Sequence, residues 1–325
     1  MENNFLTIGI PIRNEEKNLE SFIKSLSTAI NILCHTLPKL KIEVLFCINN
    51  TTDNSKDIVR KIAFENISNV SLIESEPGKM NAITKIAHTR LFKDSMNCFI
   101  DADIILEKNC LLNLVQDLLD HKNIFLVYSS VHPNQNERQG FMQKIQKTHY
   151  NLREHINARK YFHGRAYIIR SSEILERNLR LSNKHPNWGL IKGPYVDDIY
   201  LSRVIFHEYG PKSIREVTRA KVFFFPPKNI KDFYLGQRRL LLEIERLNLL
   251  YPEHVYIQKK YFKKKINWSY FLYAKLSDFF KYLPYFFIEE GTRLLIRFEI
   301  LLISIGIIKI KSIWNPLKTT KYGKY

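Results

Sequence analysis

Cys98-Phe99-Ile100-Asp101-Ala102-Asp103 is the stretch from which the expected architecture follows. Its first three residues predict a short buried strand, and two carboxylates follow directly, one residue apart. In open α/β sheets, ligands bind at the carboxyl ends of the strands, where such a pair can hold a divalent cation and the phosphates that the cation neutralises. An isolated Asp-x-Asp pair is also a common exposed turn, so the interpretation depends on the surrounding sequence.

Short apolar stretches alternate with amphipathic helical patterns around this stretch. Strands are predicted over residues 5–10, 42–48, 70–73, 98–100 and 124–130. Helices are predicted over residues 19–33, 55–64 and 107–120, the first of them capped by Asn14 and a further one opening near Lys79. Strands that alternate with helices through short turns predict a mainly parallel sheet that is covered on both faces.

The second half of the chain departs from this simple alternation. A strand is predicted at residues 166–169, and residues 182–195 predict a functional loop because they are rich in Gly, Pro, Asn and Trp. A strand over 221–225 and a helix over 230–250, capped by Asn229, follow. Because the composition changes after this helix, we expect a domain of residues 1–250 and an extension of residues 251–325.

The chain is strongly basic, with a net charge of +18 over 325 residues. Such an excess favours polyanionic partners, which include nucleic acid, anionic membrane surfaces and phosphate-bearing substrates. The four cysteines form no Cys-x-x-Cys pair, which favours free thiols in a reducing cytoplasm over disulfides or zinc sites. Neither a signal peptide nor an uncharged apolar window of membrane-spanning length is visible, so a cytoplasmic location is expected.

Other short motifs accompany the Asp-x-Asp pair along the chain. Each is loose by itself, but together they occur in a particular order at plausible spacing. They are Ile-Pro-Ile-Arg-Asn-Glu at residues 10–15, Asn-Asn-Thr-Thr-Asp at 49–53, Gly-Lys-Met-Asn-Ala at 78–82, Val-Asp-Asp-Ile-Tyr-Leu-Ser at 196–202 and Gln-Arg-Arg at 237–239.

In this combination the motifs resemble those of the large family of inverting glycosyltransferases with the GT-A fold, commonly called family 2. Its members show P-x-x-N-E, D-D-G-S-x-D, G-K-x-x-A, D-x-D, E-D and often Q-x-x-R-W. The resemblance covers residues 5–240. It implies a GT-A-type, Rossmann-like mixed and mainly parallel α/β sheet with flanking helices, followed here by a C-terminal helical extension. It also implies a nucleotide-sugar donor and a saccharide or lipid-linked acceptor.

The resemblance implies different roles for the two acidic pairs. It implies that Asp103, with Asp101 beside it or on the ribose, holds Mg2+ or Mn2+, and that the cation stabilises the departing diphosphate. It also implies that Asp198 is the general base, with Asp197 standing where the family has Glu. If the resemblance is set aside, Asp197 and Asp198 are interpreted as an acidic first turn that stabilises its helix through the helix dipole.

Further positions are implied in substrate binding, although surface or core roles stay open for Lys79, the two arginines and Trp188. Asn49 replaces the family's first Asp of the strand-two turn, which leaves the donor base open, and the missing Arg-Trp disfavours processive synthesis. The donor set is Pro11, Asn14, Glu15, Asn49, Asp53, Lys79, Asp101, Arg238 and Arg239, and the acceptor set is Gly164, Arg165 and Trp188.

The extension combines lysines with aromatic residues. Lysines over residues 259–265 are interleaved with aromatic side chains, further aromatic residues follow over 270–287, and residues 300–308 form an apolar run. Three interpretations stay open: a helix at an anionic membrane surface, plain packing on the catalytic domain, and binding of single-stranded nucleic acid, which is the least favoured. Membrane association would make the protein peripheral on the cytoplasmic face.

Two other functions stay open at this point. A non-catalytic protein that binds membrane or nucleic acid through a degenerate GT-A fold is suggested by Asn49 and by the missing Arg-Trp. A sugar-phosphate nucleotidyltransferase needs a glycine-rich loop after the first strand, and residues 12–15 contain no glycine. The leading hypothesis requires Asp103 and Asp198 to share one pocket, so their placement on opposite sides of the molecule would exclude it.

Overall fold

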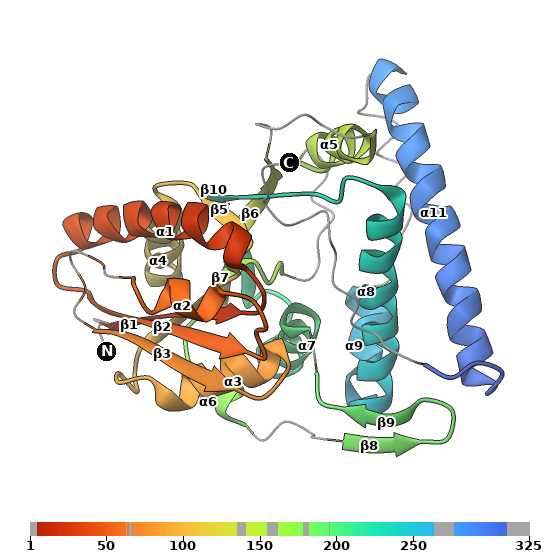
Figure 1. Cartoon of the computed structure of the whole chain (residues 1–325), viewed down its shortest axis with the longest axis horizontal. Coiled ribbons are helices and arrows are strands. Elements are labelled where there is room, and N and C mark those ends of the chain that lie inside the picture. The colour runs from red at the N-terminus through yellow and green to blue at the C-terminus, as the bar shows by residue number, and fades with distance from the viewer. Residues whose placement is uncertain are drawn as a thin grey trace.

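The computed structural model describes residues 5–310 except 63, 65–66, 68, 135–140, 155–161, 178–181, 195 and 263–275. Within these residues a single curled sheet forms the centre, and helices lie against both of its faces (Figure 1). Part of the basic extension, residues 263–275 and 311–325, lies outside the described residues, including the expected aromatic and lysine positions there.

Eight described strands form the central sheet in the order β3-β2-β1-β4-β7-β6-β10-β5. β1 pairs in parallel with β2 and β4, and β2 pairs in parallel with β3. β7 is antiparallel to β4 and β6, β10 is parallel to β6, and β5 is antiparallel to β10. The strands are β1 (Phe5–Ile12), β2 (Lys41–Asn49), β3 (Asn69–Ser75), β4 (Met96–Ile100), β5 (Ile104–Leu106), β6 (Leu126–Pro133), β7 (Ala166–Ile169) and β10 (Ile214–Phe224).

The described helices flank this sheet and continue beyond it toward the C-terminal part. A separate hairpin of β8 (Ser182–His185) and β9 (Gly189–Lys192) follows β7 in the chain. The helices are α1 (Glu16–Thr36), α2 (Ser55–Val59), α3 (Lys79–Thr89), α4 (Cys110–Asp120), α5 (Phe141–Glu154), α6 (Glu173–Glu176), α7 (Asp197–Tyr209), α8 (Ile230–Leu250), α9 (Val255–Tyr261) and α11 (Leu276–Ser304), with a 3-10 turn at Pro252–His254.

Apolar side chains from the two faces of the sheet form separate buried clusters. On one face, Ile8 of β1 packs with residues of α1 and α4, such as Phe22 and Leu114. On the other face, Phe99 of β4 packs with residues of α3, α7 and α8, such as Ile205. Successive strand residues point to opposite faces, so one strand can serve both clusters. The expected α/β sheet with flanking helices is confirmed.

Several predicted boundaries differ from the structure for local reasons. The helix expected over 55–64 ends at Val59. The Lys61 and Ile62 N–H groups donate to carbonyls three residues back, in tight turns, and no longer four residues back as in an α-helix. Asn14 does not cap α1: it has a positive φ of 56°, and its Oδ1 accepts from the Thr52 N–H at 2.7 Å. The loop expected over 182–195 contains the β8-β9 hairpin. Asn229 does cap α8, since its Oδ1 accepts from the Asp232 N–H at 2.8 Å.

α11 lies along the outer edge of the molecule, beside α8 (Figure 1). Its inner side contacts α8 and α5, and Tyr285, Ile296 and Ile303 are buried there. Arg238 of α8 donates to both carboxylate oxygens of Glu299 on α11, at 3.0 and 2.8 Å. Among the described helices, α11 included, none has the length and apolar character that crossing a bilayer requires.

Candidate active site

Four polar groups meet just beyond the carboxyl end of β4. Lys79 is the first residue of α3, Asp101 follows β4 directly, and Asp197 is the first residue of α7. The Lys79 Nζ lies 2.6 Å from Asp101 Oδ1 and 3.0 Å from Asp197 Oδ1. It also donates to the Gly164 carbonyl at 2.9 Å. Residues that are far apart in the sequence thus share one small polar centre.

The segment before β7 closes this centre from the other side. The Asp101 N–H donates to the Arg165 carbonyl at 2.8 Å, which extends the antiparallel pairing of β4 and β7 by one step. A Cβ atom on Gly164 would lie 2.9 Å from Asp197 Oδ1, closer than ordinary van der Waals contact. A side chain at position 164 would therefore require the Asp197 carboxylate to shift.

Asp197 is almost fully buried, and its partners fix it. The Tyr167 hydroxyl, on β7, donates to Asp197 Oδ2 at 3.0 Å, while Lys79 contacts Oδ1. Burial lowers the pKa of Lys79, but the charges of Asp101 and Asp197 outweigh this effect and raise that pKa above its usual value, so Lys79 stays charged. Sequence analysis missed Tyr167, although it is the only polar residue of the apolar strand 166–169.

Asp198, the expected base, has a different environment from its neighbour. Its Oδ1 accepts from the Ile199 N–H at 2.8 Å, and the Gly164 N–H also donates to its carboxylate. Burial and the adjacent Asp197 charge raise the pKa of Asp198 to about 6. The side chain is partly exposed. A carboxylate with such a pKa is ionised near neutral pH and can still accept a proton.

Arg239 of α8 links this centre to Asp103. The pKa of the Arg239 guanidinium is lowered, mainly by burial and also by the charge of Arg165. The charges of Asp103 and Asp198 act in the opposite direction and raise that pKa. Arg165 lies 3.9 Å from Asp103 Oδ1 and over the Phe224 ring, 4.2 Å from its centre. Asp103 and Asp198 therefore act on the same arginine, which places the two acidic pairs in one neighbourhood.

The oxygens of the first acidic pair fit a divalent cation. Asp103 Oδ1 is shielded from solvent and accepts no hydrogen bond from the described residues. A buried carboxylate oxygen without a donor is a ready ligand for a hard cation. The described residues contain no cluster of three or more His, Cys, Asp or Glu side chains of the kind that holds a metal. Two neighbouring carboxylates, Asp101 and Asp103, suit the kind of Mg2+ or Mn2+ site that uses one or two carboxylates and completes its coordination with substrate phosphates and water.

Most of the residues that we expected to bind the nucleotide-sugar donor after β1 and β2 form a second group at the same edge of the sheet. Asp53 Oδ1 accepts from the Ser55 N–H at 3.0 Å, and its Oδ2 accepts from the Glu16 N–H at 3.1 Å. The Glu15 N–H donates to Ser55 Oγ at 2.8 Å. With the Asn14–Thr52 bond described above, these contacts tie the loop after β1 to the loop after β2. Pro11 is partly exposed within β1.

Asn49 occupies a different position from the one expected for a residue that reads the nucleobase. It is 3 % exposed, its Nδ2 donates to the Glu76 carbonyl at 2.6 Å, and its Oδ1 accepts from the Gly78 N–H at 2.9 Å. Gly78 has a φ of 127°, which glycine tolerates and other residues rarely adopt. The amide of Asn49 is thus occupied by the loop that leads into Lys79, so we assign it to positioning that loop.

Arg238 and Trp188 also lie outside the polar centre. Arg238 donates to Glu299 of α11, so its side chain contributes to the contact between α8 and α11. Trp188, between β8 and β9, is 9 % exposed and belongs to the same apolar cluster as Ile303 of α11. This core position is one of the two roles that were left open for Trp188.

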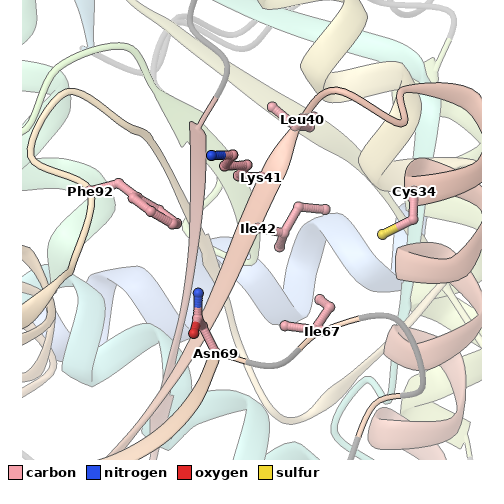
Figure 2. Close-up of a pocket in the computed structure, with 7 residues that line it drawn as sticks. All are labelled: Cys34, Leu40, Lys41, Ile42, Ile67, Asn69 and Phe92. Atoms are coloured by element: carbon pink, nitrogen blue, oxygen red, sulfur yellow. The ribbon is translucent and has the colours of Figure 1, made fainter.

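A cavity elsewhere in the molecule has no part in this centre. The cavity in Figure 2 lies at the amino ends of β2 and β3, and its lining includes Cys34, Lys41 and Asn69. This edge of the sheet is opposite to the one that carries Asp101. The cavity measures about 240 Å³, which is below the roughly 300–1,000 Å³ of typical small-molecule sites.

Comparison with known protein families identifies one match. Residues 7–179, more than half of the chain, match the family described as glycosyl transferase family 2. The matched segment begins within β1, includes the Asp-x-Asp pair and β7, and ends before the second acidic pair. A search among curated proteins finds no match.

Similar solved structures share the fold at low sequence identity. Glucosyl-3-phosphoglycerate synthase from Mycobacterium tuberculosis, solved with Mn2+, UDP and glucosyl-3-phosphoglycerate, is 19 % identical, with a TM-score of 0.47 over 74 % of this chain and 79 % of that one. A mycobacterial protein is 17 % identical, with a TM-score of 0.48 over 74 % of each chain. A mannosyltransferase from Pyrobaculum calidifontis, solved with GDP-mannose and Mn2+, is 18 % identical, with a TM-score of 0.49 over 73 % of this chain and 62 % of that one.

Proposed function

Because this chain belongs to glycosyl transferase family 2, we propose that it moves a sugar from a nucleotide-sugar donor to a hydroxyl of a saccharide or lipid-linked acceptor, with inversion at the anomeric carbon. Membership of the family makes the chain a glycosyltransferase of the GT-A class, as the sequence motifs predicted. The donor, the cation and the residue roles are the proposed part. In this proposal residues 1–250 are the catalytic domain and residues 251–325 are an extension of it.

One observation carries the proposal: the two acidic pairs lie around the same basic side chains. Lys79 contacts Asp101 of the first pair and Asp197 of the second. The charges of the two remaining members, Asp103 and Asp198, both raise the pKa of Arg239. Displacement of a nucleoside diphosphate needs positive charge near the leaving group and a base near the attacking hydroxyl. The arrangement supplies both within one neighbourhood.

Asp198 acts as the base in this proposal. The acceptor oxygen forms a bond to the anomeric carbon, and its proton passes to the Asp198 carboxylate. The bond from that carbon to the diphosphate oxygen breaks, and its electron pair leaves with the nucleoside diphosphate. In this proposal Asp197 is not the base, because Lys79 and Tyr167 contact its two oxygens. It holds Lys79 in place instead.

Asp103, assisted by Asp101, is the proposed ligand of a divalent cation. When bound, Mg2+ or Mn2+ would act as a Lewis acid on the diphosphate and reduce its negative charge. Arg239 and Arg165 lie beside Asp103 and contribute further positive charge at the same end of the site. Two of the similar proteins named above were solved with Mn2+ together with UDP or GDP-mannose, which agrees with this chemistry. They do not identify the donor of this chain.

The test is a panel of nucleotide sugars offered to the full chain with Mn2+, Mg2+ or a chelator. We expect one donor to raise the melting temperature in a metal-dependent way and to be hydrolysed slowly to a nucleoside diphosphate. Proton NMR of the glycoside formed with an alcohol acceptor, whose anomeric centre does not mutarotate, should show the configuration opposite to that of the donor. Asp103→Asn should abolish the metal-dependent stabilisation.

Asp94→Asn is the matched control, because Asp94 is exposed and lies just before the amino end of β4, whereas Asp103 lies beyond its carboxyl end. It should behave as the wild type does. Indifference of the wild type to every donor and every metal would contradict the proposal. Retained configuration would exclude inversion, and stabilisation that survives in Asp103→Asn would remove Asp103 from the cation site.

A further inference from the structure

The outer face of α11 carries large apolar side chains in contact with solvent. Phe287 is 64 % exposed and Leu294 is 63 % exposed, whereas Ile296 of the same helix is fully buried. Exposed apolar positions recur at intervals of three, four or seven residues, which places them on one side of a helix. They are Phe287, Leu294, Phe298, Leu301 and Ile305 just beyond the helix end.

This face is unusual for a helix that also packs on its own domain. The opposite side is already used, because Tyr285, Ile296 and Ile303 are buried against the rest of the molecule. No described element covers the outer side, which forms the edge of the molecule in Figure 1. A helix that is apolar on two sides buries one of them in the fold and leaves the second for a partner.

We propose that the outer face of α11 docks on the surface of an anionic lipid bilayer. The charge around the face favours this partner. Of the described side chains over residues 280–310, the only exposed charged ones are Arg297 and Lys309, and both are positive. Residues 251–325 contain 14 Lys and Arg against 5 Asp and Glu. Basic residues beside an apolar helix face strengthen binding to anionic headgroups.

A second copy of the chain is a poorer occupant of this face. Pairing of two outer faces would bring together two molecules that each carry a net charge of +18, and like charges repel. A bilayer instead offers opposite charge and a flat apolar boundary. The 29 residues of α11 form a rod of roughly 43 Å, which can lie along such a boundary over its whole length.

The helix would lie on the bilayer, since its charged side chains do not permit crossing. Residues 289–299 include Glu289, Glu290, Arg293, Arg297 and Glu299, and the buried ones among them face the protein. Interfacial helices insert their apolar face about 5–10 Å into the headgroup and acyl boundary while the polar side remains outside. In this protein the polar side is covered by α8 and α5.

Flotation of the full chain with vesicles tests the proposal independently of enzyme activity. We expect binding to vesicles of phosphatidylcholine and phosphatidylglycerol, weaker binding in high salt, and little binding to phosphatidylcholine alone. The triple variant Phe287→Ser, Leu294→Ser, Phe298→Ser should lose affinity on the order of 100-fold, because three apolar groups no longer enter the bilayer. All three positions are exposed, so its melting temperature should stay close to that of the wild type.

Leu91→Ser is the control, because Leu91 is also 63 % exposed but lies between α3 and β4. It should bind vesicles as the wild type does. A second variant, Arg297→Glu with Lys309→Glu, should weaken binding without removal of any apolar side chain. The proposal is overturned if the wild type binds no vesicles, if it binds neutral vesicles equally well, or if the triple variant binds as the wild type does. A dimer in sedimentation velocity that the triple variant dissociates would assign the face to a second copy and overturn it as well.

Discussion

Around Lys79, charged side chains are buried, while along the outer face of α11, large apolar side chains are exposed. Asp197 is 3 % exposed at its side chain, and Phe287 is 64 % exposed. Both arrangements are unfavourable in an isolated protein, because buried charges lose hydration and exposed apolar groups remain in water. The first is compensated inside the fold by ion pairs, whereas the second has no compensation within the described residues. The comparison therefore separates a site that is assembled by folding from one that needs a partner.

The largest effect is expected from Asp198→Asn, which tests whether the polar centre is catalytic. An amide cannot take the acceptor proton, so kcat should fall about 1,000-fold. Because the charge that is removed lies beside Asp197, the melting temperature should stay the same or rise. Donor consumption and circular dichroism measure the two quantities. Loss of activity that is accompanied by unfolding, or full activity, would contradict the role of Asp198.

Lys79→Met tests whether the buried charges depend on one another. Without the ammonium group, Asp101 and Asp197 are left as neighbouring carboxylates, and the free energy of unfolding should fall by about 3 kcal/mol. Urea denaturation measures this change. Adding Asp197→Asn to the same chain should recover part of the lost stability, because one unpaired charge is then removed. A double variant as unstable as Lys79→Met would show that packing, and not charge, explains the loss.

The two sides of α11 provide a matched pair of substitutions. Ile296→Ala removes a fully buried side chain and should lower the free energy of unfolding by about 2 kcal/mol, as cavities in protein cores do. Leu294→Ala, on the outer face and 63 % exposed, should change it by less than about 0.5 kcal/mol. Urea denaturation compares the two variants. Equal losses would mean that the outer face is also covered by the protein itself.

The smallest expected effect is the dependence of the reaction on pH. Only ionised Asp198 can accept a proton, and burial with the Asp197 charge raises its pKa to about 6. The value of kcat/KM should therefore fall as pH decreases through 6, and about tenfold for each further unit. Rates measured in a series of buffers give the profile. Activity that is constant from about pH 7 to about pH 5 would contradict an ionised Asp198 as the base.

The sequence predicted the elements whose patterns are local. β7 and α8 begin and end where the apolar run and the Asn229 cap indicated, and the central sheet follows from alternation of strands and helices. The predicted ends of helices and strands are wrong where tertiary contacts override the local preference of the sequence. Asn14, for example, bonds across to Thr52 on the next loop instead of capping its own helix.

The candidate site was predictable to the extent that motif position reflects position on the sheet edge. Lys79, Asp101 and Asp197 come together as their places at strand and helix ends implied. Asn49 and Arg238 illustrate the limit, because hydrogen-bonding groups are taken by whichever neighbour lies nearest, here Gly78 and Glu299. Tyr167 was missed for the same reason, since nothing in an apolar strand indicates which carboxylate its hydroxyl will meet.

At Gly164, a single added carbon atom would disturb the position of the Asp197 carboxylate. The Gly164 backbone binds Lys79 and Asp198, while the missing side chain leaves room for Asp197. A methyl group there would push against a carboxylate that Lys79 and Tyr167 hold from both sides. We expect Gly164→Ala to displace the Asp197 carboxylate and lower the activity while every charge in the molecule is kept, so it can serve as a low-activity variant of unchanged charge in localisation experiments.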